Sequence, residues 1–130
     1  MTLVDTSVWI DYFRDNESSE TTHLTNAVQN NEDICVSGII VTEILQGVLD
    51  EKEYHSVKAL LNTFIFLPMP IEAYVLAADI YRHAKQKGQT IRNTIDCLIA
   101  ACAITHEVPL LQDDKDYLTI SKFSKLKLVS

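Results

Sequence analysis

The sequence begins with the stretch TLVDTSVWIDYF (residues 2–13), in which a short apolar segment leads into an acid and then into a helical pattern. Residues 2–4 predict a strand, and Thr6 or Ser7 can cap a helix that extends to about Arg14. Asp5 therefore stands where a buried strand ends and a helix begins. An acid at such a position is hard to explain as solvated surface, so the end of this strand is the first candidate site.

The remainder of the chain repeats this alternation of strand and helix patterns. Apolar spacings, capping residues and breakers predict helices over residues 20–29, 38–49, 51–62, 72–87 and 93–105. The same features predict strands over 34–36, 64–67, 108–111 and 126–129, with a turn over 113–116. Strands that alternate with helices at this spacing predict an α/β fold, a three-layer sandwich with a mainly parallel central sheet.

Length and composition predict one compact domain over residues 1–130. With 47% hydrophobic and 22% charged residues, the chain can bury about two-thirds of the surface that it exposes when unfolded. The three cysteines lie in apolar surroundings without a metal-binding spacing, so we expect reduced core residues. The start has no basic leader, and no window approaches the roughly 20 apolar residues that cross a bilayer. We therefore expect a cytoplasmic protein without a membrane segment.

The net charge of −7, from 11 basic and 18 acidic residues, speaks against a nucleic-acid partner. This objection weakens if several of the acids bind divalent cations, because the cations would cancel their charge locally. The basic residues are also grouped, with one group over residues 82–92 and a second over 122–127. Either group could contact phosphates, and a solvated helix end and a solvated tail are the alternatives.

Four acids interrupt apolar sequence: Asp5, Glu43, Asp96 and Asp114. Asp96 gives the strongest signal, because the other residues of 95–104 are all apolar and a helix that is apolar all round is a buried one. It also stands in the first turn of its predicted helix, where the helix dipole favours a negative charge. Glu43 borders the apolar stripe of its helix, and a side chain that reaches into water is the alternative there.

The other two acids also have ordinary explanations. Asp5 could simply cap the first helix, and Asp114 could be a turn acid like its neighbours Asp113 and Asp116. The combination discriminates, because Asp5 and Asp114 both follow strands, and the functional crevice of a parallel sheet lies at the carboxyl ends of its strands. Four converging carboxylates without a counter-ion would be severely destabilising. Ligation by oxygen alone favours Mg²⁺, or Mn²⁺, over zinc.

Several segments, in order, resemble the motifs of PIN-domain ribonucleases, and most closely those of the VapC toxins of toxin–antitoxin pairs. The segments are VDTSVWID (residues 4–11), VTEILQG (41–47), GQTIR (88–92) with IDCLIAA (95–101), and DKDY (114–117). The resemblance covers essentially the whole chain. It implies the following roles: catalytic and metal-binding acids at Asp5, Glu43, Asp96 and Asp114, a fifth metal-binding acid at Asp116, and supporting hydroxyls at Thr6 and Ser7.

The same resemblance implies a cofactor and partners. A toxin of this kind is expected to cut RNA with Mg²⁺ and so inhibit translation, to form a homodimer, and to bind a VapB-like antitoxin that inserts a segment into the acidic groove. Two positions depart from the family pattern. Gln112 stands where the family often has Ser or Thr, so a supporting hydroxyl is lost there or supplied by Thr6. Tyr117 replaces the usual Phe, which we interpret as a mild change.

These expectations define a hypothesis for the chemistry. Bound Mg²⁺ would lower the pKa of a water and clamp the scissile phosphate. Asp5, Asp96 and Asp114 would hold the principal ion, and Glu43 would orient the water or bridge to a second ion. Arg92 is a candidate phosphate contact, and a surface arginine at a helix start is the alternative. Two other functions stay open: a non-catalytic module that binds RNA or protein, and a PIN-type nuclease of RNA processing.

Overall fold

The computed structural model describes residues 1–129 and contains a sheet of four parallel strands. The strands are β1 (Thr2–Val4), β2 (Ile34–Val36), β3 (Ile65–Phe66) and β4 (Leu110–Leu111), in the order β3-β2-β1-β4. Leu3 of β1 pairs with Cys35 of β2 on one side and with Leu110 of β4 on the other. The predicted parallel sheet is therefore confirmed.

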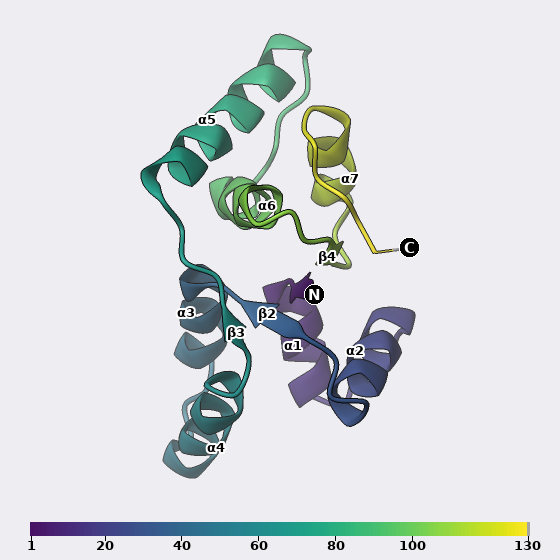
Figure 1. Cartoon of the computed structure of the whole chain (residues 1–130), viewed down its shortest axis with the longest axis vertical. Coiled ribbons are helices and arrows are strands. Elements are labelled where there is room, and N and C mark those ends of the chain that lie inside the picture. Colours follow the sequence, from purple (N-terminus) through teal and green to yellow (C-terminus); the bar gives the residue numbers. More distant parts are fainter. Residues whose placement is uncertain (130) are drawn as a thin grey trace.

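Helices cover both faces of this sheet (Figure 1). They are α1 (Thr6–Phe13), α2 (Ser19–Gln29), α3 (Gly38–Gln46), α4 (Glu51–Leu61), α5 (Ile71–Gln86), α6 (Thr94–Thr105) and α7 (Lys115–Lys122). Helix α1 packs against α2 and α3, and α3 against α4, on one face, whereas α5, α6 and α7 pack together on the other. The strand order accounts for this division. The chain adds β2 and β3 in one direction and then returns to β4, and crossovers between parallel strands follow one hand as a rule. The predicted three-layer α/β sandwich is confirmed.

The return of the chain creates a switch point between β1 and β4. β1 lies in the interior of the sheet, with β2 and β3 on one side and β4 on the other. The connections that follow two such strands turn to opposite faces and leave a crevice at the carboxyl edge of the sheet. Asp5 follows β1 directly and Gln112 follows β4 directly. The fold therefore delivers the residues after both strands to one crevice.

Apolar side chains fill the layers on both faces of the sheet. In α6 the buried residues are Cys97, Ile99, Ala100, Ala101, Cys102 and Ala103, as expected for a helix that is apolar all round. α5 presents small residues toward α6, with Ala73, Ala77 and Ala84 buried. On the opposite face the fully buried Trp9 stacks on Phe13. Within residues 1–129, no helix has the length and apolar run that crossing a membrane requires.

The cysteines lie in this core without a disulfide partner. Cys35, Cys97 and Cys102 are all buried and free, which confirms the prediction of reduced core residues. Burial raises the pKa of the Cys97 and Cys102 thiols to about 11. Because the thiolate is the reactive form, these two side chains act as packing residues.

The C-terminal part differs from the prediction in two respects. The predicted turn over 113–116 is the start of a helix, α7, because Asp114 caps it and Tyr117 and Ile120, three residues apart, are buried. The predicted strand over 126–129 is wrong. Only Leu128 forms a bridge, to Leu110, and its neighbours donate and accept one hydrogen bond each with that residue. The reason is that β4 has two residues, so its outer edge offers too few backbone groups for a regular ladder.

Candidate metal centre

Two helix starts position the acids that follow β1 and β4. Asp5 caps α1: its Oδ2 accepts hydrogen bonds from the Ser7 hydroxyl at 2.7 Å and from the Ser7 backbone N–H at 3.4 Å. Asp114 caps α7: its Oδ1 accepts from the Asp116 backbone N–H at 2.9 Å. The backbone N–H of Asp114 in turn donates to Gln112 Oε1 at 2.6 Å. Both acids thus serve as caps, and neither is left as a solvated turn residue.

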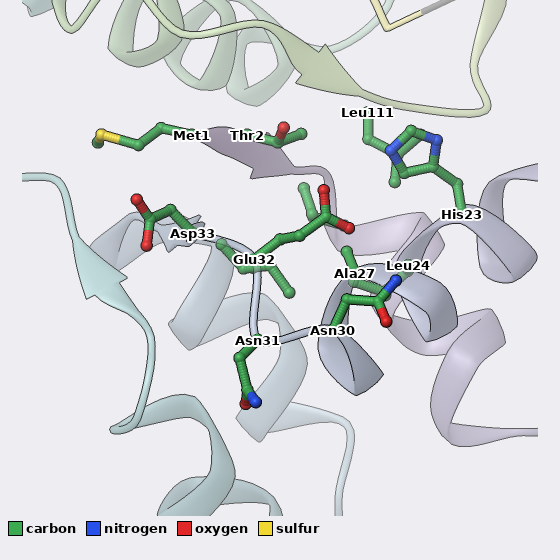
Figure 2. A pocket seen from close by; sticks show the side chains of 12 residues that line it. Met1, Thr2, His23, Leu24, Ala27, Asn30, Asn31, Glu32, Asp33 and Leu111 are labelled. Atoms are coloured by element: carbon green, nitrogen blue, oxygen red, sulfur yellow. The ribbon is translucent and has the colours of Figure 1, made fainter.

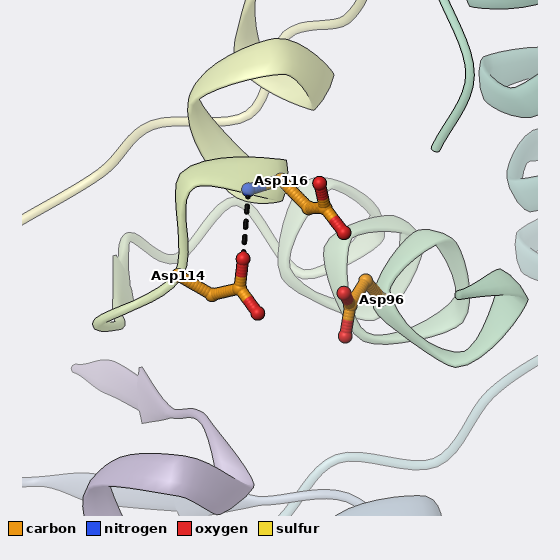
Figure 3. Close-up of side chains that lie close together, drawn as sticks. All are labelled: Asp96, Asp114 and Asp116. Carbon is orange, nitrogen blue, oxygen red and sulfur yellow. Dashed lines mark hydrogen bonds between the residues drawn. The ribbon is translucent and has the colours of Figure 1, made fainter. Parts of the chain in front are cut away.

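Three carboxylates meet where α6 and α7 begin (Figure 3). Asp96 lies in the first turn of α6, which Asn93 caps, while Asp114 and Asp116 lie at the start of α7. One carboxylate oxygen from each of the three acids lies within 4.8 Å of those of the other two. Asp116 is buried, and the other two acids are half-buried. The structure therefore brings together three of the five acids that the sequence singled out, Asp96, Asp114 and Asp116.

Tyr117 connects Asp5 to these three acids. Its hydroxyl donates to Asp5 Oδ1 at 2.7 Å and lies 3.3 Å from Asp96 Oδ1. The ring is fully buried, and burial together with the two carboxylates holds the pKa of Tyr117 well above its usual range. The interpretation of Tyr117 as a mild replacement for Phe missed these contacts. Its spacing of three from Asp114 was the available signal, because it places the ring on the inner side of a helix that Asp114 caps.

Glu43 lies on α3 and contacts a different hydroxyl. Thr6 Oγ1 donates to Glu43 Oε1 at 2.7 Å, and this contact joins α1 to α3. Both hydroxyls that the sequence suggested, those of Thr6 and Ser7, therefore hydrogen-bond to an acid. Among the hydrogen bonds of residues 1–129, Glu43 has none to the three acids at the starts of α6 and α7.

Arg92 lies against the cluster on its solvent side. Its Nε donates to Asp116 Oδ2 at 3.1 Å and its Nη2 to Asp114 Oδ1 at 3.3 Å. The arginine side chain is 63% exposed, whereas that of Asp116 is 10% exposed. The hydrogen bond that Arg92 donates to Asp116 raises the pKa of Arg92. Arg92 is therefore an exposed arginine that two acids of the cluster hold in place.

The cluster holds more negative charge than Arg92 balances. The pKa of Asp96 is raised to about 7, first by burial and then by the charges of Asp5 and Asp114. A carboxyl that resists ionisation for these reasons gains most from a nearby cation. The donors are oxygens alone, which suits a hard cation such as Mg²⁺ or Mn²⁺ and does not suit zinc. The residues present therefore fit the divalent metal that the sequence predicts.

A separate cavity of about 350 Å³ lies between α2 and the sheet (Figure 2). Its lining includes Leu24 and Ala27 of α2 together with Val4 and Leu111 of the sheet, and His23 and Glu32 at the rim. None of the acids discussed above lines it. The chemistry of the site lies in the acidic cluster.

The fold and the cluster together define an α/β protein whose carboxylates, suited to a divalent cation, gather at the switch point of a parallel sheet. The PIN domain model matches residues 2–123 of the chain. The protein therefore belongs to the PIN-domain family. Solved structures of similar fold include VapBC2 from Rickettsia felis bound to a promoter DNA fragment, with a TM-score of 0.77 and 19% identity over 98% of this chain and 96% of that one. FitAcB from Neisseria gonorrhoeae has a TM-score of 0.72 and 20% identity over 100% and 97%.

Curated relatives share the full length of the chain. The VapC ribonuclease Mb1587 of Mycobacterium bovis is 33% identical over 100% of this chain and 98% of its own length. The ribonuclease VapC11 of Mycobacterium tuberculosis gives the same values. The ribonuclease VapC1 of Methanocaldococcus jannaschii is 29% identical over 97% of this chain and 85% of its own length. The similarity to VapC proteins predicted from the sequence motifs is confirmed.

Proposed function

We propose that the protein is a metal-dependent endoribonuclease that hydrolyses RNA phosphodiester bonds and acts as the toxin of a VapBC-type toxin–antitoxin pair, inhibiting translation. The observation that carries this proposal is the meeting of Asp96, Asp114 and Asp116 within 4.8 Å at the switch point of the sheet. The full-length similarity to VapC ribonucleases supports it. The intact set of acids argues against a non-catalytic binding module.

The acids divide into those that would hold the cation and those that would act beside it. Asp96, Asp114 and Asp116 would hold Mg²⁺, or Mn²⁺, with Asp5 as the adjoining ligand. Such an ion, when bound, lowers the pKa of a coordinated water and offsets charge on the departing oxygen. Glu43 lies on α3 and accepts a hydrogen bond from Thr6. There its carboxylate can orient the attacking water or take up its proton.

Arg92 is the proposed contact to the RNA backbone. Its guanidinium lies at the exposed rim and presents planar donors that match a phosphate. While the acids carry their full charge, Asp114 and Asp116 hold it. A cation held by those acids would weaken this hold, and the guanidinium would then be available to the phosphate next to the scissile bond.

The partners follow from the same assignment. We propose a VapB-like antitoxin that inserts a segment into the acidic groove, where a basic side chain would compete with the metal for the carboxylates. Solved structures of similar fold include such pairs, among them VapBC-1 from nontypeable Haemophilus influenzae. We also propose a homodimer, for which exposed Ile71, Tyr74 and Val75 on one side of α5 offer an apolar surface. Light scattering of the purified chain tests the dimer.

Incubation of total cellular RNA with the purified protein tests the activity. The lanes contain Mg²⁺, Mn²⁺ or EDTA, and the variants are Asp96→Asn and, as a matched control, Asp33→Asn, which changes an exposed acid outside the cluster. We expect metal-dependent fragments with the wild type and Asp33→Asn, and none with Asp96→Asn. Intact RNA in every lane, with metal binding retained, would instead favour a binding module. Fragment ends would identify the RNA and separate a toxin from a nuclease of RNA processing.

A further inference from the structure

The Tyr117 hydroxyl lies where three segments that are distant in the sequence meet. The ring comes from α7, Asp5 from the end of β1, and Asp96 from the first turn of α6. The tyrosine is fully buried, and its hydroxyl bonds to these two carboxylates. A phenylalanine would fill the same space. Packing alone does not explain the hydroxyl, because burying a polar group is unfavourable unless it is hydrogen-bonded.

The distances show how the hydroxyl is used. At 2.7 Å the bond to Asp5 Oδ1 has the length of a charge-assisted hydrogen bond, and the contact to Asp96 Oδ1 at 3.3 Å is weaker. Ser7 holds the other oxygen of Asp5, Oδ2, at 2.7 Å. Both oxygens of Asp5 are thus fixed from opposite sides, one by its own helix start and one by α7. The Asp5 carboxylate cannot rotate without breaking one of these bonds.

We propose that Tyr117 is a positioning residue of the metal centre, whose hydroxyl holds the Asp5 carboxylate in the orientation in which it and Asp96 present oxygens to a shared divalent cation. This inference rests on the proposed metal-dependent function. A carboxylate oxygen has two lone pairs, so an oxygen that accepts from Tyr117 can still coordinate a metal. Hydrogen bonds to metal-binding carboxylates commonly set both the geometry and the strength of binding.

The position of Tyr117 on α7 adds a second consequence. Asp114 and Asp116 belong to the same helix start, and α7 packs against α6. The hydrogen bond from Tyr117 to Asp5 therefore fixes the position of α7, with its two acids, relative to the end of β1. Without the hydroxyl, the carboxylates at the starts of α1, α6 and α7 would keep their places in the fold and lose their common orientation.

The test measures Mn²⁺ binding to the purified full chain by the loss of the free-ion electron paramagnetic resonance signal. We expect Tyr117→Phe to raise the Kd for Mn²⁺ by about 10–100-fold, the usual cost of removing a hydrogen bond to a metal ligand. The matched control is Tyr81→Phe, which removes the hydroxyl of a half-buried tyrosine on α5 and should leave the Kd unchanged. Circular dichroism and thermal unfolding without metal verify that both variants are folded.

A double-mutant comparison separates positioning from packing. If Tyr117 acts through Asp5, then adding Tyr117→Phe to an Asp5→Ala chain should raise the Kd little further, whereas independent effects would multiply. A wild-type Kd in Tyr117→Phe, alongside weakened binding in Asp96→Asn, would overturn the inference and leave the metal centre intact. Absence of Mn²⁺ binding by the wild type would overturn both this inference and the proposed metal dependence.

Discussion

The acids of the site form two halves whose carboxylates meet different partners: a β1 half, Asp5 and Glu43, and an α7 half, the cluster of Asp96, Asp114 and Asp116. On the β1 side, hydroxyl groups meet the acids: Ser7 and Tyr117 on Asp5, and Thr6 on Glu43. On the α6 and α7 side, three carboxylates face one another, and one exposed arginine contacts two of them. Neutral donors orient an acid without cancelling its charge. In the β1 half, the hydroxyls therefore fix the orientation of the carboxylates. In the α7 half, the negative charge exceeds the positive charge, so a cation would stabilise that half most.

Asp96→Asn should break the α7 half most severely. Because the acid is proposed to share the cation, its loss should remove several kcal/mol of transition-state stabilisation, or about 10²–10³-fold in kcat/KM. The same change should raise the melting temperature of the metal-free protein at pH 8, because it removes a half-buried charge that three neighbouring acids repel. Nuclease assays and thermal unfolding in EDTA measure the two effects. A variant that lost activity and stability together would show that Asp96 has a structural role instead.

The stability of the metal-free protein should depend on pH through Asp96 of the α7 half. The folded protein holds the Asp96 proton up to a pKa of about 7, whereas an unfolded chain releases it near 3.8. Between these values the folded state binds more protons, so the stability of the metal-free protein should fall as pH rises from about 4 to 7. Thermal unfolding in EDTA from pH 5 to 8 measures the trend. Saturating Mg²⁺ should remove the fall, and so should Asp96→Asn; a wild type as stable at pH 8 as at pH 5 would contradict the assignment.

Arg92→Gln tests how the two halves differ in charge, because it removes the only basic side chain that pairs with the α7 half within residues 1–129. We expect tighter Mg²⁺ binding, because the arginine competes for Asp114 and Asp116, together with a KM for RNA raised by about fivefold at most, since exposed charge contacts are weak. The matched control is Arg82→Gln, which breaks an equally exposed pair with Asp79 on α5. Weaker Mg²⁺ binding in Arg92→Gln would show that the arginine supports the metal instead of competing with it.

Most of the fold and the individual acids could be predicted from the sequence, because both depend on local patterns of apolar and polar residues. Asp5 follows a buried strand, and Asp96 stands alone in an apolar helix, so both could be selected without coordinates. The helix α7 was missed because DDKD was interpreted as a turn, although the same acids cap a helix well. With α7 absent, Tyr117 had no place in the site.

Contacts between distant segments were out of reach for a different reason. Arg92 pairs with acids 22 and 24 residues away, and Tyr117 with one 112 residues away. Local periodicity carries no information about which segments meet. The strand order, and hence the switch point that brings the starts of α1, α6 and α7 together, supplies that information. The topology thus determines that hydroxyl groups contact the acids of the β1 half and that an arginine contacts those of the α7 half.

The hydroxyl half should respond least, and Thr6→Val tests it. Valine keeps the shape of threonine and removes the donor to Glu43, a hydrogen bond of net worth about 1 kcal/mol, so kcat should fall by about fivefold. The Kd for Mn²⁺ should not change, because Glu43 is assigned to the water and not to the ion. The control is Thr42→Val, on the same helix as Glu43, because the Thr42 hydroxyl donates to the Gly38 carbonyl and to no acid within residues 1–129. A Kd raised as strongly as in Asp96→Asn would erase the distinction between the halves, since it would make Glu43 a ligand and Thr6 its support.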